Sequence, residues 1–128
     1  MPLKMLLIEF SCWKGWRSFM RNNDLLNSIS IKYPIRTADS FISRFFGLMG
    51  KRNVDYGLLL IPCKSIHTFF MKIDIDVVYL DHSLTVVDIE RNMKPWKTGK
   101  YRSKAYGVLE LPAGMADKLD IVVGMTLC

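Results

Sequence analysis

The chain has 128 residues, of which 50% are hydrophobic and 23% are charged, and its formal net charge is +6. This length is enough for one domain with a buried core, and the hydrophobic content excludes a disordered chain. No apolar run reaches the roughly 18–20 residues that span a bilayer, so we expect no transmembrane segment and a soluble, cytoplasmic protein.

Residues 1–27 combine a short apolar run with an aromatic and basic stretch. We expect them to form a leader outside a single domain of residues 28–128. At the start of that domain, Ile29, Ile31 and Tyr33 alternate as in a strand, which we expect to end at Pro34.

Residues 37–52 have the apolar spacing of a helix. The side chain of Thr37 or Asp39 would cap its first turn, and Gly50 would end it, because glycine readily adopts the positive φ found after a helix.

The rest of the chain predicts mostly strands. A tight turn is expected at residues 81–83, a long loop at 91–104 and one or two helical turns at 113–120. The predicted strands cover residues 56–62, 65–73, 76–81, 84–90, 106–112 and 121–127. This order predicts a mainly β (α+β) fold, a small closed or half-closed β-barrel-like domain with one or two short helices.

The predicted loop at 91–104 carries a charge equal to the whole net charge of the chain. It has no anion and six cations, which are Arg91, Lys94, Lys97, Lys100, Arg102 and Lys104. It is typical of a solvated loop or one that docks an acidic partner. The alternative is binding of nucleic acid or another anionic polymer, because aromatic side chains between cations suit base stacking and phosphate contacts. The candidate rim for an anionic partner is Lys94, Trp96, Lys97, Lys100, Tyr101 and Arg102.

Residues 66–81, "IHTFFMKIDIDVVYLD", contain one of the two histidines and three aspartates. If they form a strand, His67 lies in register with the apolar side chains, while Asp74 and Asp76 lie on the opposite face. The pattern indicates a histidine at the core edge and aspartates that are solvated or paired. We expect Asp76 to pair with Arg44.

Three motifs in this order resemble a prokaryotic family, the domain of unknown function 192. They are R-x-x-G-L-M on Arg44, Gly47, Leu48 and Met49, then F-M-K leading to an aspartate on Phe70, Met71, Lys72 and Asp76, and L-E-L-P-A-G on residues 109–114. The resemblance covers roughly residues 35–127. It implies a compact β-rich domain and supplies no activity.

The expected function is a ligand- or partner-binding module with a polar pocket formed by Arg44, His67, Asp76 and Glu110. The ligand is an unknown small molecule or a protein partner. A second alternative to polymer binding is a small hydrolase or lyase that uses His67 with Asp74 or Asp76. No catalytic residue, cofactor or metal is predicted, because Cys63 and His67 offer only two of the three or four donors that a zinc site needs.

Overall fold

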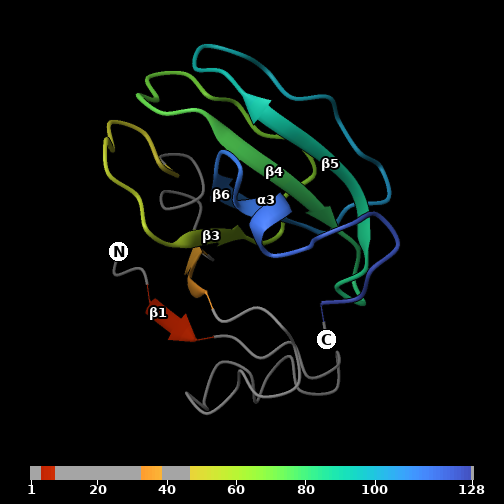
Figure 1. Ribbon diagram of the computed structural model, residues 1–128. Helices are drawn as coiled ribbons and strands as arrows, with labels where there is room; N and C mark the ends of the chain where they lie inside the picture. The colour runs from red at the N-terminus through yellow and green to blue at the C-terminus, as the bar shows by residue number, and fades with distance from the viewer. Residues whose placement is uncertain (1–3, 8–32, 39–46, 128) are drawn as a thin grey trace.

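The computed structural model describes residues 4–7, 33–38 and 47–127. In this part of the chain, six strands form one sheet and a single helical turn, α3, lies against it (Figure 1). The elements are β1 (Lys4–Leu7), β2 (Pro34–Ala38), β3 (Gly57–Leu60), β4 (Ile75–Leu80), β5 (Val86–Met93), β6 (Gly107–Pro112) and α3 (Met115–Lys118).

The strand order is β1-β2-β3-β6-β4-β5, with β2 and β3 parallel and the other neighbours antiparallel. Among the described strands, β1 and β5 form the two edges, so the sheet is open. The predicted mainly β domain is therefore confirmed, in its half-closed form.

The three central strands are buried on both faces. Every residue of β3 and β4 is buried, and so are the first five of β6. Their sequences, "GLLL", "IDVVYL" and "GVLELP", are almost continuously apolar, which is typical of strands covered on both sides. Asp76 and Glu110 are the only ionisable residues in these strands apart from Tyr79.

The two faces of the sheet carry two separate cores. We call one the helix face: Val78, Leu80, Leu109 and Leu111 pack there with Ala116 of α3, Ile121 and Leu127. We call the other the loop face: Leu58, Val77, Tyr79 and Val108 pack there with Leu48, Ile66, Met71 and Met93. In Figure 1, α3 lies in front of the sheet, over its helix face.

Two of the predicted strands are wrong. Residues 65–73 form a loop, in which His67 and Thr98 form an isolated bridge and Phe70 takes a left-handed backbone with φ 62°. Residues 121–127 make one bridge, between Thr85 and Thr126, and are otherwise irregular, with a turn at 123–124.

The predicted helix at 37–52 begins too early, because Thr37 lies in β2. Residues 47–50 form a turn, and the intervening 39–46 lie outside the described residues. β2 begins at Pro34, and proline suits the first residue of a strand, whereas Ile29 and Ile31 of the strand expected before Pro34 lie outside the described residues. Of the helices described, none has the length and apolar character needed to cross a bilayer.

Candidate functional site

The structure does not bring the predicted polar pocket together. Asp76 stands opposite Leu111 and Val77 stands opposite Glu110, so the two carboxyl groups point to opposite faces of the sheet. Arg44, the expected partner of Asp76, lies outside the described residues.

Asp76 binds the chain's own backbone on the helix face. One carboxylate oxygen, Oδ2, accepts from the N–H groups of Gly114 (2.9 Å) and Ala116 (3.0 Å) at the start of α3. The other, Oδ1, accepts from the N–H of Asn92 (2.9 Å), at a bulge in β5. Asp76 is only 1% exposed, so its carboxylate joins β4, β5 and the helical turn inside the core. In the P-A-G turn, the N–H of Gly114 thus binds this internal carboxylate, and the N–H of Ala113 donates to the backbone carbonyl of Asp74.

Glu110 is buried on the loop face between Leu58 of β3 and Val77 of β4. Its Oε2 atom has no hydrogen-bond partner among the described residues. Burial raises the pKa of Glu110 to about 8, because the charged form loses its hydration. The side chain is 3% exposed and therefore cannot contact a ligand at the surface of the folded domain.

His67 lies in the loop before β4 and is half-buried. Its Nδ1 accepts the N–H of Phe69 at 3.2 Å, and its ring stacks on the Phe69 ring with centroids 5.1 Å apart. The predicted position in a core strand is therefore wrong, and His67 stands beside a group of exposed aromatic rings.

The cations of the basic segment 91–104 are of two kinds: some form ion pairs with described residues and others do not. Arg91 pairs with Asp117, Lys94 with Asp74, and Arg102 with Asp88 and Glu90. Arg102 also lies over the Tyr79 ring, 4.3 Å from its centroid, so it belongs to the structure rather than to a rim. Within the described ranges, no ion pair involves Lys97, Lys100 or Lys104, and all three side chains are exposed.

Three loops meet at one end of the sheet and form what we call the aromatic groove. The groove has a volume of about 440 Å³ and is lined by Met49, Gly50, Phe70, Met71, Lys72 and Trp96. This volume lies within the range of small-ligand sites, roughly 300–1,000 Å³. Phe70 and Trp96 are each 59% exposed, and their ring centroids are 4.7 Å apart. Phe69 extends the aromatic surface, with its ring 6.1 Å from that of Trp96.

Thr68, whose side chain is fully buried, joins its own loop to the loop that contains Lys94 and Lys97. Its Oγ1 donates to the carbonyl of Lys94 (2.7 Å) and accepts from the N–H of Lys97 (2.8 Å). Its backbone carbonyl accepts from Met71 and Trp96. The N–H of Gly50 donates to the carbonyl of Phe70 and so ties in the third loop. The groove is therefore held by hydrogen bonds that are independent of any ligand.

The two exposed rings stand on a costly backbone. Phe70 and Trp96 have φ values of 62° and 64°, in the left-handed region, where a side chain costs about 1–2 kcal/mol. Bulky residues in this region are rare, and a glycine at either position would avoid the cost. Two exposed aromatic side chains therefore lie on a backbone conformation that is unfavourable for them.

Sequence reasoning included Trp96 and Lys97 among the candidate residues but missed Phe69, Phe70 and Thr68. The available signal was the F-M-K motif, because Phe70, Met71 and Lys72 all line the groove. Met49 of the R-x-x-G-L-M motif lies opposite them in the same lining. Treating residues 65–73 as one strand concealed this arrangement.

Fold and site define a small, mainly β domain with an open mixed sheet and an aromatic groove at one end. Residues 25–128 match the model of the DUF192 family, described as "Uncharacterized ACR, COG1430", and the chain belongs to this family. A UPF0127 protein from Thermococcus sibiricus is 41% identical over 96 residues, which cover 70% of this chain and 62% of that relative. The matched segment spans 60–62% of the length of three Thermococcus relatives.

Two solved structures are similar in fold. A protein of unknown function from Novosphingobium aromaticivorans has a TM-score of 0.66 and 20% identity, covering 74% of this chain and 75% of its own. A protein from Sinorhizobium meliloti described as a "putative transcription regulator" has a TM-score of 0.66 and 23% identity, covering 72% and 78%. At these identities the likeness shows the fold alone.

Proposed function

We propose that this chain is a binding module whose ligand site is the aromatic groove, and that the ligand presents a flat ring together with a negative charge. The observation that carries the proposal is the pair Phe70 and Trp96, two large exposed rings held on left-handed backbone. A backbone that is already held in this conformation has little freedom left to lose when a ligand stacks on the rings, which lowers the cost of binding.

The charge around the groove supports an anionic ligand. Lys72 lines it, Lys51 follows Gly50 in the chain and Lys97 follows Trp96; we call these three the groove lysines. Each is exposed, and none forms an ion pair with any side chain that the structure describes. The nearby Asp74 is neutralised by Lys94.

The groove replaces the polar pocket as the proposed site, and His67 belongs to its edge through the stack on Phe69. A hydrolase or lyase gains no support from these contacts. Asp76 is buried and accepts three backbone N–H groups, while Asp74 pairs with Lys94. A carboxylate acting with His67 would have to give up these bonds.

The test uses 8-anilino-1-naphthalenesulfonate, a probe with flat rings and one negative charge, added to the native full chain. We expect saturable fluorescence enhancement that falls about tenfold in affinity in Phe70→Ala and in Trp96→Ala, from the loss of roughly 1.4 kcal/mol of stacking. The matched control is Val122→Ala, which removes an exposed apolar side chain outside the groove lining (56% exposed). Equal affinity in all four proteins would overturn the proposal.

A further inference from the structure

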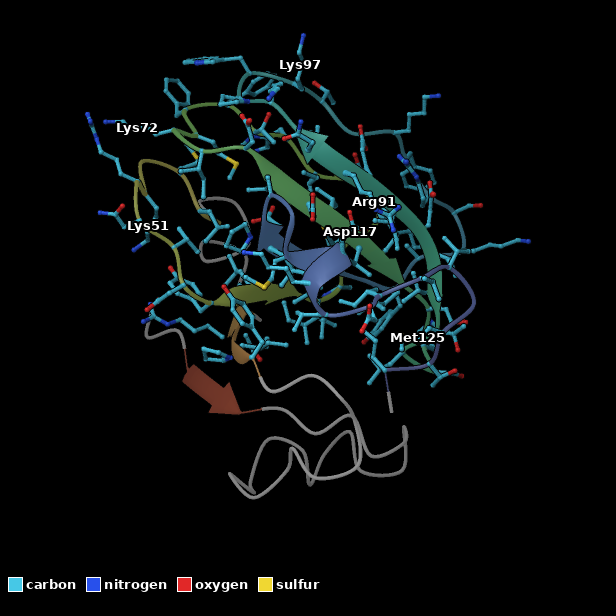
Figure 2. All side chains as sticks on the ribbon, viewed as in Figure 1. Lys51, Lys72, Arg91, Lys97, Asp117 and Met125 are labelled. Carbon is cyan, nitrogen blue, oxygen red and sulfur yellow. The ribbon has the colours of Figure 1, made fainter. Side chains whose placement is uncertain are left out.

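The groove lysines come from the same three segments of the chain that line the groove. Figure 2 shows Lys51, Lys72 and Lys97 projecting outward from the domain. By contrast, Arg91 and Asp117 lie together in front of the sheet in the same view, where they form an ion pair. Each segment of the groove therefore brings a positive charge, as needed for a ligand with repeated negative charges.

The lining of the groove is suited to rings and poorly suited to hydroxyl groups. Among its six residues, no side chain is a carboxylate, an amide or a hydroxyl, and Lys72 provides the one charged group. A neutral sugar needs acceptors as well as donors in fixed directions, and the side chains of this lining provide donors, on Lys72 and Trp96, but no strong acceptor. Stacking on Phe70 and Trp96 requires only a flat face, which every nucleobase has.

We infer that the ligand of the aromatic groove is a single-stranded nucleic acid, whose bases stack on the two exposed rings while its phosphates contact the groove lysines. This inference rests on the proposed function of the groove and names its ligand class. Inside a duplex the faces of the bases are covered by the base pairs stacked above and below them, so a duplex cannot use the rings. The combination of aromatic platforms and a basic surface is what sequence-tolerant single-strand binding requires.

The site differs from the one expected from the basic segment alone. Arg91, Lys94 and Arg102 are engaged in ion pairs within the domain. Lys51 and Lys72, which lie outside that segment, take their place at the groove. Three phosphate contacts on a single strand give a slope of about −2 in a plot of log K against log salt concentration, at about 0.7 per contact.

The experiment measures fluorescence anisotropy of short fluorescein-labelled oligothymidylate and oligouridylate with the full chain at several salt concentrations. We expect single strands of either kind to bind at least tenfold more tightly than a duplex of the same length. Trp96→Ala and Phe70→Ala should each lower the affinity about tenfold. Phe70→Gly serves as a second variant, because it removes the ring and relieves the backbone.

Charge variants test the phosphate contacts separately. Lys51→Gln, Lys72→Gln and Lys97→Gln should each reduce the salt slope by about 0.7, whereas Lys118→Gln on α3 should leave it unchanged. Poly-L-glutamate, a polyanion without rings, should bind weakly and without dependence on Trp96.

Two results would overturn the inference. One is binding of duplex or poly-L-glutamate as tight as that of single strands, and the other is single-strand binding unaffected by the ring substitutions. If the sulfonate probe binds the groove in a ring-dependent way but oligonucleotides neither bind nor displace it, the ligand class is wrong and the proposed function survives. If neither the probe nor the oligonucleotides depend on Phe70 and Trp96, both proposals fail.

Discussion

Two regions near the start of β4, one around Asp76 and one around Thr68, treat polar and aromatic groups in opposite ways. Around Asp76, at the helix face, a carboxylate is buried and saturated by three backbone N–H groups. Around Thr68, at the aromatic groove, buried hydrogen bonds hold large rings and lysines out in solvent. The first arrangement uses a buried carboxylate to join two strands and the helical turn, whereas the second holds apolar rings at the surface. This difference supports the proposed role of the groove in binding.

Asp76→Ala should have the largest effect on stability. It leaves the N–H groups of Asn92, Gly114 and Ala116 without an acceptor, and we expect the free energy of unfolding to fall by about 3–5 kcal/mol. Urea denaturation measures it. The control is Asp81→Ala, which removes a carboxylate that accepts from Ser83 and Thr85 in a surface turn and should cost about 1 kcal/mol. Equal losses in the two variants would show that the Asp76 cluster is no stronger than a surface turn.

Glu110, which belongs to neither the Asp76 cluster nor the aromatic groove, should make the free energy of unfolding depend on pH. Its pKa rises from 4.5 to about 8 in the folded chain, so the folded state retains a proton that the unfolded state releases. The free energy of unfolding should therefore be highest near pH 4.5 and fall as pH rises toward 8, by about 1.4 kcal/mol per pH unit from this group.

Urea denaturation from pH 5 to pH 8 tests this slope. Glu110→Gln, which cannot ionise, should lack the contribution, and the substituted chain should exceed the parent in stability at the alkaline end. Asp117→Asn provides the control, because Asp117 is an exposed carboxylate paired with Arg91. Parallel pH profiles for the parent and Glu110→Gln would contradict the assignment.

Thr68→Val tests whether the groove depends on its buried hydrogen bonds. The substitution preserves the shape of the side chain but leaves the N–H of Lys97 without an acceptor, and we expect a loss of about 2 kcal/mol together with weaker binding of the sulfonate probe. Thr68→Ser should retain most of both. Thr85→Val, which removes a hydroxyl contact to Thr126 at an exposed position, should cost less than about 1 kcal/mol and leave probe binding intact. Loss of stability without loss of probe binding would separate Thr68 from the site.

Periodicity predicted the central strands well because β3, β4 and β6 are apolar on both faces, a pattern with few alternatives. It failed at residues 65–73, where an equally apolar sequence forms a loop. The apolar side chains there include Phe69 and Phe70, which face solvent, and hydrophobicity alone cannot distinguish a core ring from an exposed one. The left-handed backbone of Phe70 carries no sequence signal either, since glycine or asparagine would be expected at such a position.

The polar site was predicted poorly for a related reason. Asp76 and Glu110 were individually identifiable as polar residues in apolar strands, but whether they share a face depends on the register between β4 and β6. A change of one residue in this register moves every side chain of a strand to the other face, and no local sequence pattern determines the register. The basic segment was easier to find, yet only the ion pairs of Arg91, Lys94 and Arg102 reveal which of its cations are free.

The smallest expected effect concerns the backbone at Phe70. It distinguishes the cost of backbone strain from the loss of the contacts made by the ring. Phe70→Ala and Phe70→Gly both remove the exposed ring, but only glycine adopts a φ of 62° without steric cost. We expect Phe70→Gly to be more stable than Phe70→Ala by about 1 kcal/mol in urea denaturation, while both bind the sulfonate probe equally poorly. Gly50, whose φ is 74°, provides the opposite substitution. Gly50→Ala should lower the free energy of unfolding, because it introduces a Cβ into the same backbone region. If Phe70→Ala is as stable as Phe70→Gly, the backbone at Phe70 is unstrained, and backbone strain no longer supports the groove as a binding site.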